Sequence, residues 1–252
     1  MTVFERLVQA LRRRSLSTFL MELLVLTLGV FLGFQVDRWY ENYRDSQTVD
    51  VYLDRLISDV EEDISVLNDV KVSSAVRLEA VNLLVASLSD AELVEQDPTA
   101  FVIALEQATY RFQMVARDAT FQELVSTGLM TLLPEKTRGA LYEYYAHISS
   151  YAQFKPALDM IQAQSFERFA GVLTPDLYND AIIDVSAGLQ RSYTQAQAQA
   201  AAERFWAKPE AIEWLGRMKQ AQIQMGFTAE MTLERAETVL GHLKCVQEAA
   251  SC

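Results

Sequence analysis

Histidine and cysteine are scarce in this chain, with two of each among 252 residues. Structural zinc sites need clustered cysteine and histidine ligands, and a ferritin-like di-iron site needs two Glu-x-x-His pairs with two further glutamates. The sequence contains neither pattern. Glu143 and His147 share one helical face but stand alone, and His147 is expected to be a hydrogen-bonded residue rather than a ligand. We therefore expect no metal and no cofactor.

Motifs for phosphate binding and nucleophilic catalysis are also missing. No G-x-x-x-x-G-K loop and no G-x-S-x-G elbow occurs. Ser126, Thr127 and Gly128 fit the end of a helix better than a reactive turn. A net charge of −12 disfavours nucleic acid as a partner. These absences predict a non-enzymatic protein with no catalytic residues.

Proline and glycine are few, with five and nine residues respectively, and the alternation typical of strands is nearly absent. Helix-forming residues dominate, and only one apolar stretch reaches membrane-spanning length. The predicted fold is all-α. A single N-terminal transmembrane helix continues into a long stalk helix and an extramembrane helical bundle.

The apolar stretch is residues 16–36, LSTFLMELLVLTLGVFLGFQV. A bilayer core needs about 20 apolar residues in a helix. No small-x-small cleavage pattern follows, which argues against a cleaved signal peptide. Basic residues precede the stretch and aromatic residues follow it, as expected at the two membrane surfaces. The predicted interface anchors are Arg12, Arg13, Arg14, Trp39, Tyr40 and Tyr43.

Charge distribution predicts the orientation. Four arginines and one glutamate give the first fifteen residues a charge of +3, which leaves −15 for the remainder of the chain. The positive-inside rule then places residues 1–15, a short amphipathic segment, in the cytoplasm. Residues 16–36 span the bacterial inner membrane. Residues 37–252 form a periplasmic helical domain, with a stalk at 37–90 and a bundle at 98–252.

Small and polar residues share one face of the predicted transmembrane helix: Ser15, Thr18, Glu22, Gly29 and Gly33. The Gly29-x-x-x-Gly33 spacing lets a second helix approach closely. A carboxylate in the membrane is costly, so Glu22 should face protein, water or the headgroups. Three interpretations stay open: a helix–helix interface between copies, an ion or proton path in an oligomer, or a Glu22 side chain that reaches the headgroups.

The stalk continues as an amphipathic helix to about Leu88, followed by a loop to Pro98. Its predicted buried face is Val49, Leu53, Leu56, Val60, Ile64, Leu67 and Val70. Its predicted solvent face is Asp50, Asp54, Asp59, Glu61, Glu62 and Asp63.

Later helices are marked by their boundary residues. Pro98 is expected to open a helix capped by Asp97, and Pro134 and Pro209 to open two more. A capping box at residues 120–123 predicts another helix that ends near Gly128. Residues 195–202, rich in alanine and glutamine, are expected to form an exposed helix.

Aromatic residues gather in the helix that follows Pro134. Tyr142, Tyr145, His147 and Tyr151 form a possible pocket for an apolar or cationic ligand. The ordinary alternative is bundle core with hydroxyl groups at its rim. Cys245 and Cys252 lie about 10 Å apart on a continuous helix, so a bridge between them requires the helix to end after Gln247. An intermolecular bond or free thiols are the other possibilities.

Two blocks of the sequence resemble a family of small bacterial single-span membrane proteins known only as a domain of unknown function. The first block has the form E-x6-G-x3-[GA]-x-Q-x3-W-x-E and consists of Glu22, Gly29, Gly33, Gln35, Trp39 and Glu41. Gly33 stands where the family pattern has alanine, which keeps this face small. The second block consists of Ala119, Thr120, Phe121, Leu124, Ser126, Gly128, Tyr144 and Tyr145. The resemblance is good over the N-terminal third and loose over the last hundred residues. It implies a helical inner-membrane protein and no known activity.

The function expected first is that of a membrane-anchored periplasmic protein that self-associates through its transmembrane and stalk helices. Such a protein would scaffold or regulate another membrane protein, with the lipid bilayer and further copies of itself as partners. The alternatives are a periplasmic ligand-sensing or binding module, and an oligomeric pore or proton path that uses Glu22.

Overall fold

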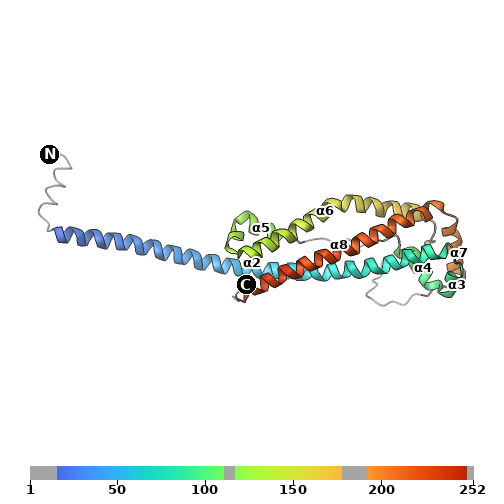
Figure 1. The fold of residues 1–252 in the computed structure, drawn as a ribbon, viewed down its shortest axis with the longest axis horizontal. Coiled ribbons are helices and arrows are strands. Elements are labelled where there is room, and N and C mark those ends of the chain that lie inside the picture. Colours follow the sequence, from blue (N-terminus) through green and yellow to red (C-terminus); the bar gives the residue numbers. More distant parts are fainter. Residues whose placement is uncertain (1–15, 111–116, 178–191, 249–252) are drawn as a thin grey trace. The chain divides into compact units, whose positions relative to one another are not determined.

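The computed structural model describes residues 16–110, 117–177 and 192–248, and the regular elements in these ranges are all helices (Figure 1). The predicted all-α fold is confirmed. The chain divides into two compact units, residues 1–52 and 53–252. Helix α2 (Leu16–Ser87) begins in the first unit and continues into the second, as expected for an apolar helix that extends into a stalk.

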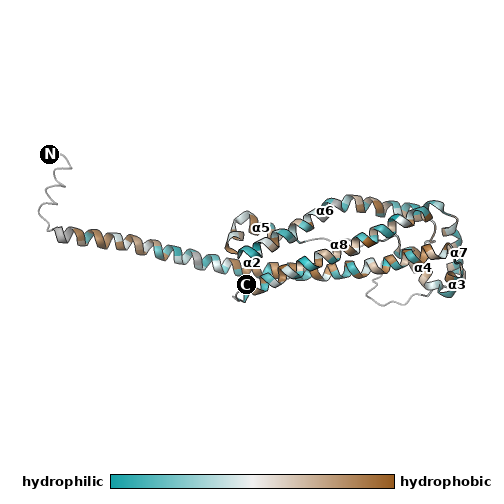
Figure 2. Ribbon diagram, viewed as in Figure 1, coloured by the Kyte–Doolittle hydropathy of each residue, from teal (hydrophilic) through white to brown (hydrophobic). Residues whose placement is uncertain are grey.

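In the first unit, α2 carries a continuous apolar surface over residues 20–36 (Figure 2). It is the one described helix long and apolar enough to cross a membrane, and none of its apolar segment is buried within the structure. Leu26 is 67% exposed and Phe34 is 66% exposed. The expected anchors Trp39, Tyr40 and Tyr43 are exposed just beyond this surface. Residues 12–15 and the side chain of Thr18 lie outside the described part.

In the second unit, α2 runs beside two other long helices, α6 (Glu135–Phe169) and α8 (Pro209–Gln247) (Figure 1). Lys71 of α2 pairs with Glu230 of α8 at 2.9 Å, and Glu61 pairs with Lys244 at 2.7 Å, so the two helices are antiparallel. The buried face of α2 is a stripe at helical spacing: Leu53, Leu56, Val60, Leu67, Val70, Val81 and Leu84.

Short helices close the two ends of this unit (Figure 1). Helix α5 (Ala119–Thr127) and the 3₁₀ helix η1 (Leu129–Leu132) lie at one end. Helices α3 (Glu92–Gln96), α4 (Pro98–Gln107) and α7 (Gln195–Trp206) lie at the other. Large apolar side chains fill the core there, and the rings of Phe169 and Phe205 stack with their centroids 5.9 Å apart.

Most predicted helix boundaries are confirmed. The Asp97 carboxylate accepts a hydrogen bond from the Ala100 amide at 2.8 Å, which caps α4 directly before Pro98. Gly128 ends α5 with a φ of 77°, a left-handed conformation that favours glycine. Pro134 precedes the first residue of α6, and Pro209 is the first residue of α8.

Two predictions about local structure are wrong. Thr120 does not cap α5: it lies inside the helix, and its hydroxyl donates to Asp59 instead. The capping box occurs before α7, where Thr194 and Gln197 exchange hydrogen bonds. Residues 195–202 form the expected helix but not an exposed one, because Ala198, Ala201 and Ala202 are fully buried. Small side chains let α7 pack closely against the core.

Candidate functional site

A buried carboxylate lies at the end of the second unit where α2, α5 and α6 meet. Asp63 of α2 is 0% exposed, so its placement on the solvent face of the stalk was wrong. The Tyr144 hydroxyl of α6 donates to its Oδ2 at 2.9 Å, and Arg117 Nη1 donates to its Oδ1 at 3.2 Å. Both oxygens of this buried carboxylate therefore have partners, as the cost of burying a charge requires.

Burial and hydrogen bonding act in opposite directions on the Asp63 carboxyl group. Burial raises its pKa above the ordinary value, and this effect exceeds the lowering by Tyr144 and Arg117. The Arg117 guanidinium also donates to Glu62, so one arginine bridges two neighbouring carboxylates. Arg117 thereby ties the segment before α5 to the side of α2.

Two adjacent tyrosines of α6 lie in this region with unequal partners. Tyr144 is 0% exposed and Tyr145 is 4% exposed, and burial raises the pKa of both phenols. The Tyr145 ring stacks on Phe121 of α5 with centroids 4.2 Å apart. Its hydroxyl is buried and has no hydrogen-bond partner within the described part of the chain. Tyr144 is therefore held by a hydrogen bond, whereas Tyr145 is held by ring packing.

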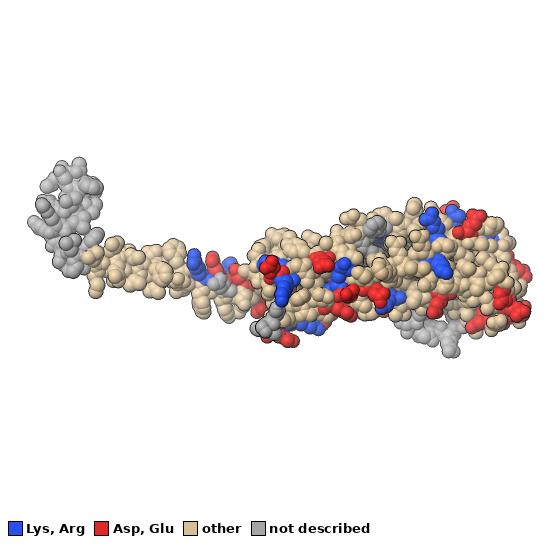
Figure 3. Space-filling view, viewed as in Figure 1, with Lys and Arg blue, Asp and Glu red and all other residues tan. Residues whose placement is uncertain are grey.

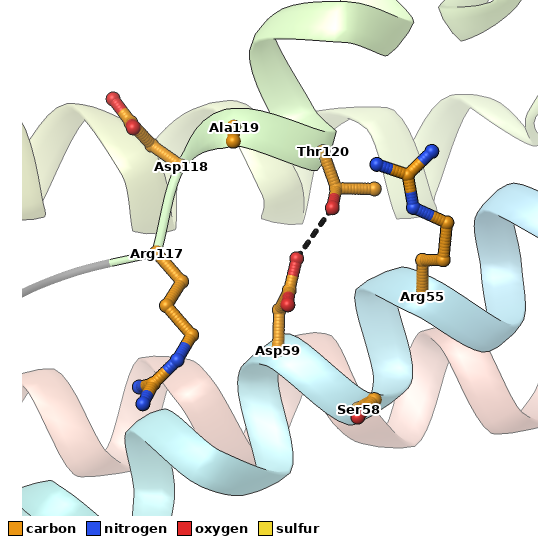
Figure 4. Close-up of a pocket in the computed structure, with 7 residues that line it drawn as sticks. All are labelled: Arg55, Ser58, Asp59, Arg117, Asp118, Ala119 and Thr120. Atoms are coloured by element: carbon orange, nitrogen blue, oxygen red, sulfur yellow. Dashed lines mark hydrogen bonds between the residues drawn. The ribbon is translucent and has the colours of Figure 1, made fainter.

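A cavity of about 450 Å³ lies between α2 and the start of α5 (Figure 4). In Figure 4 Asp59 lies between Arg117 and Arg55, and the Asp118 carboxylate points away from it. The Thr120 hydroxyl donates to Asp59 Oδ2 at 2.5 Å. Asp118 precedes α5 and makes no side-chain hydrogen bond to cap it. The lining residues are Arg55, Ser58, Asp59, Arg117, Asp118, Ala119 and Thr120.

Both arginines of the cavity are already paired with carboxylates. Arg55 forms an ion pair with Glu123 of α5 at 3.0 Å. Arg117 pairs with Glu62 and Asp63. In Figure 4 the two guanidinium groups lie on opposite sides of Asp59. The carboxylates that line the cavity, Asp59 and Asp118, form no ion pair among the described residues. The local charge is therefore negative despite the two arginines.

The residues predicted to form an aromatic pocket lie along the first half of α6. Tyr142 is 49% exposed and contacts Phe121 edge to face, while Tyr145 stacks on the same ring. Nε2 of His147 is buried without a partner among the described residues, so the hydrogen bond expected there is absent. Burial and the charge of Arg235 lower the pKa of His147. The Tyr151 side chain lies outside the described part, and the pocket stays a prediction.

The predicted helix–helix face lies on the exposed surface of the first unit. A Cβ atom placed on Gly29 or Gly33 would meet no atom within 4 Å, so this face has room for another helix. Ser15 lies outside the described residues. The interface is untested and stays a prediction.

Cys245 lies on α8, two residues before the helix ends at Gln247. It is disulfide-bonded, so the possibility of a free thiol at this position is excluded. The helix ends where an intrachain bridge to Cys252 would require it to end, and Cys252 itself lies outside the described residues.

Asp63 could have been found from the sequence. Positions 56, 60, 63, 67 and 70 alternate in steps of four and three, which is the spacing of a buried helical stripe. An aspartate at the middle of that stripe signals a buried carboxylate with partners elsewhere. The partners had no such signal, because Arg117 and Tyr144 lie 54 and 81 residues further along the chain.

No protein-family model matches the chain, and neither a curated protein nor a solved structure gives a significant match. The resemblance described for the membrane segment and the middle block stays a prediction. Function must therefore be inferred from the surfaces and sites of the chain itself.

Proposed function

We propose that this protein is anchored in the bacterial inner membrane by α2, self-associates there, and scaffolds or regulates another membrane protein without catalysing a reaction. The observation that carries the proposal is the bare apolar surface of residues 20–36. Twelve large apolar side chains there are between 49% and 67% exposed. Burying one such side chain contributes roughly 1.5–3 kcal/mol, so leaving twelve half-exposed in water costs on the order of 10 kcal/mol. A bilayer removes that cost.

The charge pattern along α2 supports the same placement. Figure 3 shows acidic and basic side chains interspersed over the visible face of the second unit. The visible face of the apolar part of α2 carries none. With the arginines at residues 12–14 in the cytoplasm, residues 1–15 are cytoplasmic and residues 37–252 are periplasmic.

Self-association is supported by the small face of the same helix. Gly29 and Gly33 lie one turn apart with open space above both, and Glu22 lies near the same line of the helix. Without a hydrophobic driving force in lipid, helices associate through close packing and interhelical hydrogen bonds, for which small residues are needed. A second copy of α2 supplies small residues for close packing and Glu22 for a hydrogen bond between the helices.

Cross-linking in native membranes tests the proposal. We expect the full chain to give cross-linked oligomers, and the double substitution Gly29→Ile with Gly33→Ile to reduce them strongly, because the branched side chains separate the helices. The matched control is Leu28→Ile with Leu32→Ile, which has the same spacing and lies one residue earlier. Equal cross-linking in both double variants would contradict the proposed interface.

A further inference from the structure

The contact between α6 and α8 in the second unit has no role in membrane anchoring or in the association of α2. We propose that this contact is an acid-sensitive switch: when His147 takes up a proton, the part of α6 that follows it separates from α8. The proposal concerns only the second unit, so it stands or fails separately from the proposed membrane function.

His147 lies on the side of α6 that faces α8. Glu143, one helical turn before it, forms an ion pair with Arg235 of α8 at 3.8 Å. Later in α6, the Ser165 hydroxyl accepts a hydrogen bond from Trp214 Nε1 of α8 at 2.9 Å. The two contacts show that α6 and α8 are antiparallel, so the turn of α6 that holds His147 faces the turn of α8 before Arg235.

The Arg235 side chain is directed toward that turn. Its Nη1 donates to the carbonyl of Met231, one turn earlier on α8, at 3.1 Å. Its Nε is buried and makes no hydrogen bond within the described part of the chain. A cavity of about 270 Å³ lies beside it between α6 and α8. Close packing therefore does not hold the two helices together at this point.

A neutral His147 ring suits this position better than a protonated one. Its Nε2 is buried and has no hydrogen-bond partner among the described residues. In the neutral ring this costs at most one unsatisfied polar group, whereas the protonated ring buries a charged N–H group beside Arg235. Burial and the charge of Arg235 accordingly lower the pKa of His147.

The other charged groups around His147 do not offset a proton on its ring. Glu143 on α6 and Glu234 on α8 are exposed to solvent, and Glu143 already pairs with Arg235. On the face of α2 that packs in this unit, the nearest titratable group is Asp63, and both of its oxygens already accept hydrogen bonds. Among the described residues, a protonated His147 thus has a guanidinium as its charged neighbour across the contact and no buried carboxylate left to pair with.

The stretch of α6 after this contact is weakly held. Ile148 is buried, but residues 149–164 include no buried side chain among those described, and the next one is Ser165. Pro156 lies within the stretch and lacks the amide N–H that would continue the hydrogen bonds of the helix. Few buried apolar contacts mean a low free energy of local opening, so a charge at the start of the stretch is enough to release it.

Amide hydrogen exchange of the full chain in detergent, followed by mass spectrometry, tests the proposal. At about pH 5, peptides from residues 149–164 should exchange about threefold faster or more in the parent protein than in His147→Gln, and at about pH 7.5 the two should be equal. Comparing proteins at one pH cancels the effect of pH on the chemical rate of exchange. His147→Lys, which is charged at both pH values, should exchange fast at both. His242→Gln, at the other histidine of the chain, should behave as the parent protein does.

Four outcomes would overturn the proposal. They are an equal ratio of parent to His147→Gln at both pH values, slow exchange of His147→Lys at about pH 7.5, an acceleration in acid that Arg235→Gln leaves unchanged, and an acceleration that extends equally over the buried part of α2. The last result would mean general unfolding of the unit in acid. If His147→Gln loses its helical circular dichroism, His147→Lys and Arg235→Gln decide the question.

Discussion

Tyr144 and Tyr145 allow the same chemical change to be made at two adjacent buried positions. Replacing either residue by phenylalanine removes one hydroxyl group and keeps the ring. The Tyr144 hydroxyl donates to the buried Asp63 carboxylate at 2.9 Å, whereas the Tyr145 hydroxyl has no partner among the described residues. The two substitutions therefore separate the contribution of the hydrogen bond to stability from the contribution of the ring.

The expected magnitude follows from these partners. A hydrogen bond to a charged group contributes about 1.5–3 kcal/mol, and Arg117 remains beside Asp63, so we expect Tyr144→Phe to lower the free energy of unfolding by about 2 kcal/mol. Tyr145→Phe removes a buried hydroxyl that has no hydrogen-bond partner in the described part of the chain, so stability should be unchanged or slightly higher. The ring contact of Tyr145 with Phe121 is retained in that variant.

Urea unfolding of the full chain in a mild detergent, followed by far-ultraviolet circular dichroism, measures the difference. With a slope of about 2 kcal/mol per molar urea, Tyr144→Phe should unfold at a urea concentration about 1 M lower than Tyr145→Phe. Equal midpoints would refute the buried network, and so would a lower midpoint for Tyr145→Phe. Either conclusion requires that the free energy of unfolding of both variants depends on urea concentration with the same slope as in the parent protein.

Three further predictions concern the same unit. Removing the guanidinium by Arg117→Met should lower the free energy of unfolding by about 2–4 kcal/mol in the same urea assay, because it leaves the Asp63 carboxylate buried with one partner. A decrease no larger than that caused by the loss of an exposed ion pair would contradict this prediction. Burial raises the pKa of Asp63, so the folded state holds a proton to higher pH than the unfolded state, and the free energy of unfolding should fall as pH rises through the folded pKa. Asp63→Asn should remove this slope in urea titrations from about pH 4 upward, and a slope equal to that of the parent would exclude Asp63 as its source. Asp97→Ala should cost about 1 kcal/mol through loss of the α4 cap, whereas Asp69→Asn should cost nothing measurable.

The sequence predicted the helix boundaries well, because each boundary is set by residues next to it in the chain. Asp97, Gly128 and Pro209 act on the backbone beside them, and each ends or begins a helix in the structure as expected. The apolar stretch of α2 was equally clear, because its composition alone makes it costly to solvate.

Residues whose partners are distant in the sequence were harder to predict. Thr120 has the sequence environment of a helix cap, yet it bonds to Asp59, 61 residues earlier. Asp63 stands in a run of acidic residues that suggests a solvated face, yet it occupies the buried stripe of α2. The alanines of α7 stand among glutamines, a composition that suggested an exposed helix. They are buried instead, because close packing of α7 against the core requires small side chains there.

The mass of the full chain extracted directly into native lipid nanodiscs tests the central claim most directly. If residues 16–36 anchor the chain and present a face that binds a second copy, nanodiscs should contain two or more copies, and Gly29→Ile with Gly33→Ile should shift them to one. A single copy in every nanodisc of the parent protein would contradict self-association. Recovery of the chain in the soluble fraction would contradict the anchor itself.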